Sequence, residues 1–360
     1  MPDALPEPAA WTTIGSLTER TCEALPVLPL PERRRMREQA SDPVANDRFV
    51  AEQSLFHEVE LRQPPEVTTR DTLRIAYWNI ERCKYGPASA RLLGRVAPDV
   101  ALLGEMDLGC ARSGQAHTTR DLADALGCGY AYAVEYIELG LGDARERAWH
   151  AGQENAVGYF GNAILTRVAL QRPAIATIDD SGIWFEEPSP KIGRQMSLLA
   201  TVDLAGRPVT VVSAHFDSEV PRHRAANMAA LIEAVERYAP GGPVVIGGDF
   251  NTKTIDGVNR DRTELKLRLL AAEPHRFLRP EPYEPLFAAA AAGYDWHACN
   301  VVATTARQRP DGEPSPPFFR NDFFFTRGLA VRDPLLVEAV DEAGVAISDH
   351  EMLVVTVSLP

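Results

Sequence analysis

The sequence predicts a mixed α/β fold in which β-sheets pack as a sandwich. From Asp71 onward, about nine apolar runs of strand length are separated by polar segments. Few stretches in this region have helical character, whereas a doubly wound parallel sheet needs a crossover helix between most of its strands. The chain of 360 residues is long enough for one large domain or two medium ones, each with its own buried core.

The expected elements follow one another along this region. Strands are predicted at 73–80, 99–105, 131–137, 161–167, 195–204, 208–216, 243–250, 321–327 and 351–359. Helices are predicted around 88–97 and 221–238, and an alanine-rich stretch at 288–293 is interpreted as a helix end.

The first part of the chain has a different texture. Residues 1–69 show little strand pattern, with prolines at both ends and one plausible helix at 31–57 that breaks near Pro43. We therefore expect an N-terminal extension over 1–69, mostly helical or irregular, and a main domain over 70–360.

Composition narrows the function classes. Lysine and arginine total 37 against 50 acidic residues, a formal charge of −13, which argues against a general polyanion binder but allows a local basic groove. The basic residues are mostly arginine. Five scattered cysteines without CxxC spacing disfavour a disulfide framework and a structural zinc site. With no secretory signal pattern and no apolar run long enough to span a membrane, we expect a cytoplasmic protein.

Polar residues with useful chemistry stand where the predicted strands end. In an extended segment, residues two apart point to the same side, so Asn79 and Glu81, or Asp249 and Asn251, can face one ligand. The remaining strand-end groups are Glu105, His215, Asp322, Ser348, Asp349 and His350. Carboxylate and amide oxygens suit Mg²⁺ or Mn²⁺, whereas zinc would need more histidine and cysteine. The motifs HExxH, GxxxxGK[ST] and GxSxG are absent.

The order and spacing of these motifs resemble the endonuclease/exonuclease/phosphatase superfamily of DNase I-like phosphoesterases. The matching elements are WNIE, the strand ending in Glu105, GNAILTR, SAHFDS, GGDFNT, NDFFF and SDH, from about residue 71 to 360. GDFN combined with a C-terminal SDH is the most specific part. The resemblance implies a four-layer α/β sandwich with the active site at the strand ends of two packed sheets, and metal-dependent hydrolysis of a phosphoester.

The resemblance also implies a role for each residue. Glu105 would be the main metal carboxylate, with Asn79, Glu81 and Asp349 completing or orienting the shell around Mg²⁺ or Mn²⁺. Asp249 would activate the attacking water and Asn251 would hold a phosphate oxygen. His350, oriented by Asp322, would contact the scissile phosphate, and His215 would assist the leaving group. Asn162 in GNAILTR is a candidate for contact with the phosphate.

The substrate is the open question. We expect a small or medium phosphoester, with a DNA or RNA nuclease as the alternative and a catalytically inactive binding module of the same fold as the second. Arg120, in a segment after the Glu105 strand, is a candidate for binding an anionic group of the substrate.

Overall fold

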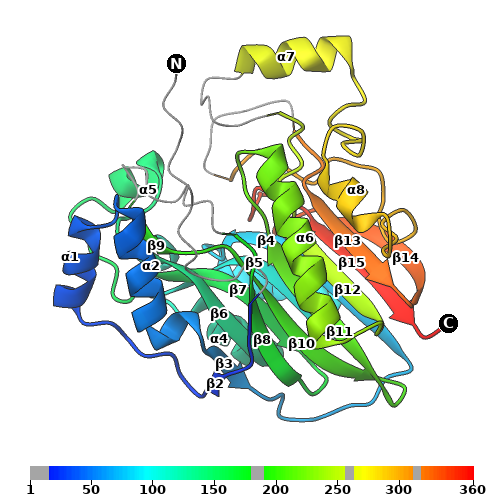
Figure 1. Ribbon diagram of the computed structural model, residues 1–360, viewed down its shortest axis with the longest axis horizontal. Coiled ribbons are helices and arrows are strands. Elements are labelled where there is room, and N and C mark those ends of the chain that lie inside the picture. The colour runs from blue at the N-terminus through cyan, green and yellow to red at the C-terminus, as the bar shows by residue number, and fades with distance from the viewer. Residues whose placement is uncertain (1–15, 180–189, 256–262, 311–317) are drawn as a thin grey trace.

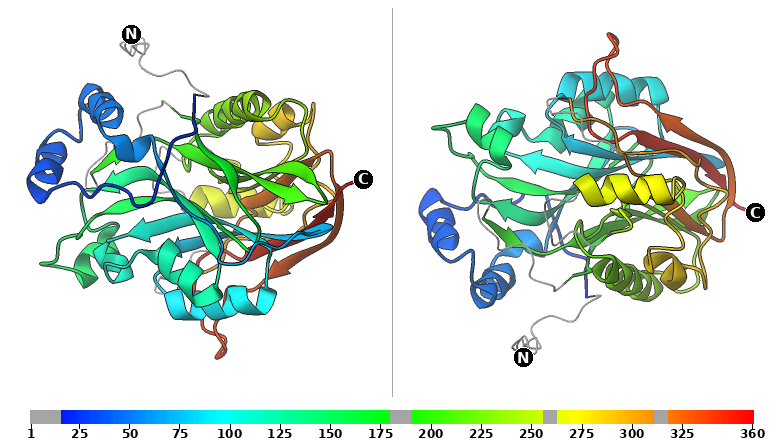
Figure 2. Two further views of the ribbon diagram at one scale, coloured as in Figure 1. Left: turned by 90° about the horizontal axis from the view of Figure 1, so that it is seen from below. Right: turned by 90° about the horizontal axis from the view of Figure 1, so that it is seen from above.

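Two β-sheets packed face to face form the centre of the molecule, and helices cover both outer faces (Figures 1 and 2). The computed structural model describes residues 16–179, 190–255, 263–310 and 318–360. The sheets are mixed, because β4·β5, β11·β12 and β2·β3 are parallel and the other pairs are antiparallel. The prediction of an α/β sandwich with four layers is confirmed.

The first sheet has nine strands within the described residues. Its order is β14 (Ala330–Val337), β15 (Met352–Ser358), β4 (Thr72–Arg82), β5 (Val100–Leu108), β7 (Tyr159–Thr166), β6 (Gly129–Glu138), β3 (Val59–Arg62) and β2 (Thr21–Cys22), and β9 (Lys191–Gly193) also pairs with β6.

The second sheet has six strands in the same part of the chain. Its order is β1 (Leu17–Thr18), β8 (Gln171–Thr177), β10 (Met196–Leu204), β11 (Arg207–His215), β12 (Val244–Asp249) and β13 (Asp322–Arg327). All nine predicted strands are present. The additional strands β8 and β14 contain a proline each and lie at or near a sheet edge, where a missing backbone donor is tolerated.

Helices form the outer layers. The α-helices are α1 (Leu30–Glu38), α2 (Pro43–Glu52), α3 (Gly86–Val96), α4 (Thr118–Leu126), α5 (Ala144–Trp149), α6 (Pro221–Tyr238), α7 (Thr263–Ala272) and α8 (Leu286–Ala290), with 3-10 turns η1 (Ser54–Phe56) and η2 (Ala111–Ser113). The two helices predicted around 88–97 and 221–238 are both present, as α3 and α6, and α6 has the predicted bounds.

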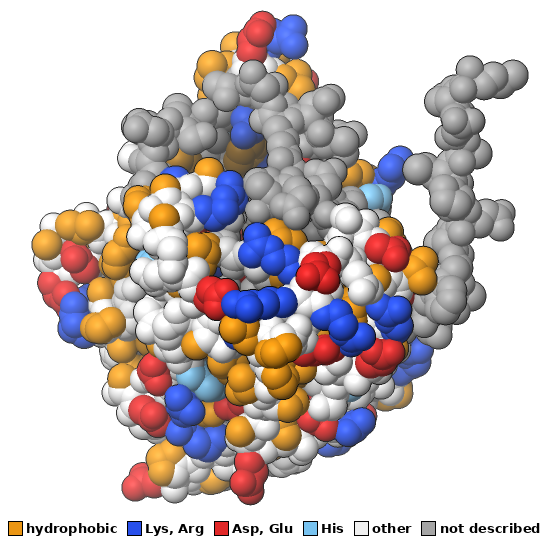
Figure 3. Space-filling view, turned by 90° about the vertical axis from the view of Figure 1, so that its left-hand side faces the viewer, with side chains coloured by type: hydrophobic (Ala, Val, Ile, Leu, Met, Phe, Trp, Pro, Cys, Tyr) orange, Lys and Arg blue, Asp and Glu red, His pale blue; other side chains and the backbone are white. Residues whose placement is uncertain are grey.

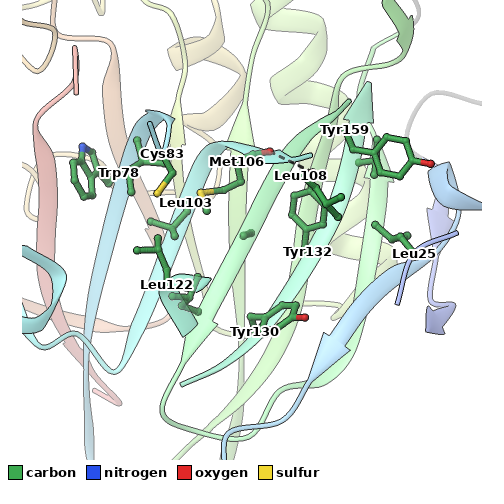
Figure 4. Close-up of a cluster of buried hydrophobic side chains, with 14 of the residues drawn as sticks. Leu25, Trp78, Cys83, Leu103, Met106, Leu108, Leu122, Tyr130, Tyr132 and Tyr159 are labelled. Atoms are coloured by element: carbon green, nitrogen blue, oxygen red, sulfur yellow. Dashed lines mark hydrogen bonds between the residues drawn. The ribbon is translucent and has the colours of Figure 1, made fainter. Parts of the chain in front are cut away.

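Each interface between layers has its own apolar core. Between the sheets, fully buried side chains such as Leu102, Leu198 and Val211 interdigitate. Outside the six-stranded sheet, α6 and α8 pack on the aromatic side chains of β13. Outside the nine-stranded sheet, the core contains Leu103 and Leu122, and Figure 4 shows it extending across the sheet as far as Leu25. These three cores hold the strand ends in fixed positions.

The N-terminal segment is part of the sheets. Its helix breaks at Pro43 as expected, but β1 joins the six-stranded sheet, and β2 and β3 extend the nine-stranded one. Glu60 of β3 accepts hydrogen bonds from the Tyr130 hydroxyl at 2.6 Å and from backbone N–H of Leu25, and lies 2.8 Å from His117 Nε2. Strands of two to four residues have too little periodicity to be recognised in a sequence. The boundary near residue 69 stays a prediction.

Deleting residues 1–69 is expected to lower the free energy of unfolding by several kcal/mol. The deletion removes β1, β2 and β3 together with the buried side chains of Phe49 and Leu55. Burial of one such side chain stabilises a fold by about 1.5–3 kcal/mol. Urea unfolding of a chain that starts at Arg70 measures the loss. Arg20→Ala, which breaks an exposed ion pair with Glu58, is the control and should change stability by less than about 1 kcal/mol. Equal midpoints for the deletion and the full chain would contradict the expectation.

Candidate active site

Three of the strand-end residues lie side by side in the six-stranded sheet. In the register of the sheet, Asp249 at the end of β12 is paired with His215 of β11 on one side and with Asp322 of β13 on the other. Paired residues on neighbouring strands point to the same face, so the three side chains form one row. Strand pairing thus brings together groups that are far apart in the sequence.

His350 reaches this row from the turn before β15, in the other sheet. Its Nδ1 lies 2.8 Å from Asp322 Oδ2, and its Nε2 lies 3.6 Å from Asp249 Oδ2. Burial by itself disfavours the charged ring, but the two carboxylates outweigh it and raise the pKa of His350 well above its ordinary value. The indole N–H of Trp78 donates to the carbonyl of His350 at 2.9 Å and fixes the turn.

Strand β4 fixes the row from the opposite sheet. Asn79 Nδ2 donates to Glu105 Oε1 at 3.1 Å and to Asp249 Oδ2 at 3.0 Å, so one amide connects two predicted site carboxylates. The Tyr77 hydroxyl, two residues earlier, accepts from backbone N–H of Asp249 at 2.6 Å. Tyr77 gives no signal in the sequence, because a tyrosine within an apolar strand is typical of an ordinary core residue.

Unusual backbone conformations turn the site residues toward one another. Glu81, Glu105 and Asn251 adopt φ of 47°, 59° and 49°, a left-handed region that costs a non-glycine residue on the order of 1–3 kcal/mol. The pairing of β4 with β5, and of β5 with β7, shifts register at Glu81 and at Glu105 respectively. Such bulges redirect side chains and are frequent beside active sites.

A guanidinium that the sequence analysis missed lies against Glu105. Arg82 Nη1 is 2.9 Å from Glu105 Oε2, and Arg82 Nε is 3.7 Å from Glu146 Oε1 of α5. Although burial raises the pKa of a carboxyl, Arg82 and His215 hold that of Glu105 well below its usual range. Glu105 is therefore ionised in the structure, and Arg82 is its counter-ion.

The other two predicted metal carboxylates also have basic partners. Lys84 Nζ lies 2.8 Å from Glu81 Oε1, while burial and the nearby Asp349 carboxylate raise the pKa of Glu81 to about 7. Asp349 Oδ2 accepts from Arg309 Nε at 2.9 Å. Each acid is thus balanced by a lysine or arginine side chain.

The oxygen donors at these positions fit a hard divalent cation. Glu81 Oε2 is buried without a hydrogen-bond partner among the described residues, and Glu105 Oε2 has only the ion pair with Arg82. Buried carboxylate oxygens of this kind, with the Asn79 amide beside them, are ligands that Mg²⁺ and Mn²⁺ accept. The assignment of Asn79, Glu81, Glu105 and Asp349 to a metal stays a prediction that this chemistry supports.

A second cluster of potential metal ligands among the described residues fits acid–base chemistry better than metal binding. Ligand atoms of Asp249, Asp322 and His350 all lie within 4.8 Å of one another. A charged imidazole donates protons and does not ligate a cation. Because His350 Nδ1 is hydrogen-bonded to Asp322 at 2.8 Å and its Nε2 lies 3.6 Å from Asp249, we interpret this group as an acid–base arrangement.

The second histidine has a carboxylate partner that the sequence analysis missed. His215 Nδ1 lies 3.5 Å from Oε2 of Glu135, a fully buried residue of β6. Burial lowers the pKa of the imidazole, but Glu135 outweighs it and raises the pKa of His215 to about 9. A charged residue inside the apolar run AYAVEYI is the signal that could have identified Glu135.

The pair should make stability depend on pH. The pKa of His215 is higher in the folded protein than the ordinary value near 6.5, so the stabilisation is complete below about pH 6.5 and is lost as the pH rises through about 9. Urea unfolding in EDTA should show the free energy of unfolding falling between pH 6.5 and 9.5, and falling less in Glu135→Gln. Parallel profiles for the two proteins would show that the pair is not coupled to folding.

A pocket of about 660 Å³ opens over the row. It is lined by Glu105, His215, Asp249, Asn251, Asp349 and His350, together with basic and aromatic side chains. Arg120 is not brought to it: this arginine is exposed on α4 and lines a different pocket with His117 and Tyr130, so its predicted role lacks geometric support. Asn162 is buried on β7, donates to the carbonyl of Met196 at 3.2 Å and does not line the pocket, and its role stays a prediction.

Comparison with known proteins decides the family. The sequence model of the Endonuclease/Exonuclease/phosphatase family matches residues 76–350. This chain belongs to that family. Endonuclease/exonuclease/phosphatase proteins are generally metal-dependent hydrolases of phosphoesters, and the resemblance drawn from the motifs is confirmed.

Solved structures show the same fold. An endonuclease/exonuclease/phosphatase from Beutenbergia cavernae superposes with a TM-score of 0.53 at 19% identity, covering 81% of this chain and 72% of its own. An endonuclease/exonuclease/phosphatase from Bacteroides vulgatus superposes with a TM-score of 0.50 at 15% sequence identity, and the match covers 80% of this chain and 99% of that protein. A protein of unknown function from Enterococcus faecalis superposes with a TM-score of 0.52 at 13% sequence identity, and the match covers 80% of this chain and 100% of that protein. No curated protein matches the sequence significantly.

Among the described residues, no helix is long and apolar enough to cross a membrane.

Proposed function

We propose that this member of the endonuclease/exonuclease/phosphatase family hydrolyses a small or medium phosphoester with the help of Mg²⁺ or Mn²⁺. The row of His215, Asp249 and Asp322, with His350 lying across it, is the observation that carries the proposal. Asp249 and both imidazoles line one pocket, and Asp322 lies behind His350, which gives the set of acid and base groups that hydrolysis of a phosphoester by water requires.

The residues divide the work by position. Asp249, oriented by Asn79 and by the Tyr77 hydroxyl, accepts a proton from the attacking water. His350 is held charged by Asp322 and donates a hydrogen bond to a nonbridging phosphate oxygen. His215, kept charged by Glu135, stabilises the leaving oxygen or protonates it.

A divalent cation has donors of the right chemistry at Glu105, Asn79, Glu81 and Asp349. When bound, it would supply charge neutralisation for the phosphoryl oxygens. Arg82 forms an ion pair with Glu105 in the structure, so this ion pair would have to break or rearrange for a cation to bind Glu105.

The dimensions of the pocket favour a compact substrate. A volume of about 660 Å³ falls within the range of small-molecule sites, roughly 300–1,000 Å³. On the face of the molecule drawn in Figure 3, the visible lysine and arginine side chains of the described residues alternate with acidic ones. A nucleic-acid duplex needs a strip of cations along its phosphates.

Turnover of bis-p-nitrophenyl phosphate tests the reaction class. We expect hydrolysis in Mg²⁺ or Mn²⁺, loss in EDTA and recovery when the metal is returned. Asp249→Asn, assayed beside the native chain, controls for a contaminating hydrolase. Undiminished turnover in EDTA would exclude the metal-dependent mechanism, and efficient nicking of supercoiled plasmid with no small substrate turned over faster would favour the nuclease alternative.

A further inference from the structure

A buried carboxylate lies behind the ion pair of Arg82 and Glu105. Glu146 of α5 is 1% exposed and does not line the pocket over the row. Its Oε1 lies 3.7 Å from Arg82 Nε and 3.9 Å from Lys84 Nζ. These two cations are the partners of Glu105 and Glu81. Glu146 therefore contacts the counter-ions of two predicted metal carboxylates without facing the pocket itself.

The contact between Arg82 and Glu146 is incomplete. Arg82 Nε and Glu146 Oε1 are both buried, and neither makes a hydrogen bond to a described residue. At 3.7 Å the two atoms lie just beyond the roughly 2.7–3.2 Å of an N–H···O hydrogen bond. Folded proteins seldom leave a buried donor and a buried acceptor unpaired, because each has lost its bonds to water. A small movement of the guanidinium would complete this bond.

Other contacts hold Glu146 in place. Its Oε2 accepts from backbone N–H of Asp143 at 2.9 Å and lies 3.4 Å from Arg112 Nη1. The Asp143 side chain accepts in return from backbone N–H of Glu146 at 3.0 Å, which completes a capping box at the start of α5. Burial raises the pKa of a carboxyl, but Arg82 and Arg112 outweigh it and hold that of Glu146 below its ordinary value. Oε1 is thus a fixed, ionised acceptor.

The same capping box offers an acid to a third counter-ion. Arg309, the partner of Asp349, also donates to Asp143 Oδ2 at 3.4 Å. Each cation that balances a predicted metal carboxylate therefore has an acid of α5 at 3.9 Å or less. Capping a helix explains the two acids and does not explain why all three cations lie beside them.

We propose that Glu146 is a positioning residue for the metal carboxylates, and that Arg82 exchanges its ion pair with Glu105 for a hydrogen bond to Glu146 when a divalent cation binds Glu105. The inference rests on the use of Mg²⁺ or Mn²⁺ in the proposed function. Without a second acceptor, a guanidinium displaced from Glu105 would remain in a largely buried place beside another cation, which is unfavourable. Glu146 keeps that charge paired and draws it away from Glu105.

Calorimetric titration of Mn²⁺ into four proteins tests the exchange without turnover. They are the native chain, Glu146→Gln, Arg82→Met and the protein that carries both changes. Glutamine removes the charge and can still complete the capping box. We expect Glu146→Gln to weaken Mn²⁺ binding about tenfold or more, the scale of one charge-assisted hydrogen bond. The same change should have little effect once residue 82 is methionine, because no guanidinium is left to relocate.

Glu138→Gln is the matched control. Glu138 is a fully buried carboxylate that accepts from Arg112 at 3.1 Å, so this change removes a negative charge from the same cluster without altering the contact between Arg82 and Glu146. It should weaken Mn²⁺ binding far less than Glu146→Gln does. Thermal unfolding of each protein shows whether a change in Mn²⁺ affinity comes from loss of the fold.

Each outcome has a distinct meaning. Unchanged affinity in Glu146→Gln, or equal losses in Glu146→Gln and Glu138→Gln, overturns the exchange. Equal weakening with and without Arg82 also overturns it, because Glu146 would then act on the cation directly. A loss that depends on Arg82 supports the exchange even if no substrate is hydrolysed, and that failure would count against the proposed reaction alone. A native chain that binds no Mn²⁺ overturns the exchange together with the metal-dependent reaction.

Discussion

Replacing Glu105 with glutamine is expected to lower kcat by about 10²-fold or more and to weaken binding of Mn²⁺ measured by calorimetry. The substitution keeps the size of the side chain but removes an ionised carboxylate, and loss of one charge-stabilising group in an active site typically costs about 10²–10³ in rate. The carboxylate is ionised in the folded protein because Arg82 and His215 face it, so its negative charge is present at neutral pH.

Arg82→Met is the matched variant with the opposite expected sign. It removes the guanidinium that lies 2.9 Å from Glu105 Oε2. Because the guanidinium no longer competes with Mn²⁺ for this carboxylate, Mn²⁺ should bind more tightly. Unchanged Mn²⁺ affinity and unchanged kcat in Glu105→Gln would contradict its assignment to the metal. Weaker metal binding in both variants would show that Arg82 organises the site and does not compete for it.

Replacing His350 with glutamine is expected to lower kcat by about 10²–10⁴-fold, the range for a positioned acid–base group. Glutamine can still donate a hydrogen bond toward Asp322 but cannot carry the charge that the two neighbouring carboxylates stabilise. Steady-state kinetics and thermal unfolding of the same preparation separate the chemical role from a structural one.

Two comparisons make the His350 result interpretable. Asp322→Asn should lower kcat less than His350→Gln, since it alters the orientation of the ring and leaves the ring in place. His57→Gln changes a half-buried histidine whose Nε2 is 2.8 Å from the carbonyl of Val50, away from the row, and should leave kcat unaltered. A His350→Gln protein with reduced stability but full kcat would make His350 a structural residue.

Apolar patterning determined most of the fold. Runs such as LRIAYWNI and PVVIGGDF predict strands because a strand buried on both faces needs nearly continuous apolar side chains, and both are strands in the structure. The same patterning could not reveal β1, β2 and β3. Strands of two to four residues are held by pairing with the sheets, as the pairing of β1 with β8, of β2 with β3 and of β3 with β6 shows, and not by their own periodicity.

The residue types of the site were readable for a related reason. A single polar residue after a strand is common in turns, but carboxylates, amides and imidazoles at the ends of several separate apolar strands are not explained by turns alone. Asn79, Glu105, His215, Asp249 and His350 therefore stood out together. Arg120 lines a different pocket from these residues, because closeness to Glu105 in the chain does not decide which way a helix faces, and its role stays a prediction.

Only the tertiary structure decided how these groups are paired. Arg82 lies on Glu105, Glu135 lies on His215, and His350 lies between Asp322 and Asp249, and each contact joins side chains from different strands or from opposite sheets. Strand register and two bulges set these distances, and neither is encoded in the periodicity of a single segment. The sequence by itself therefore determined which chemical groups are available, while the packing of the two sheets determined their charge states and partners, because electrostatic coupling acts over a few ångströms in space and not along the chain.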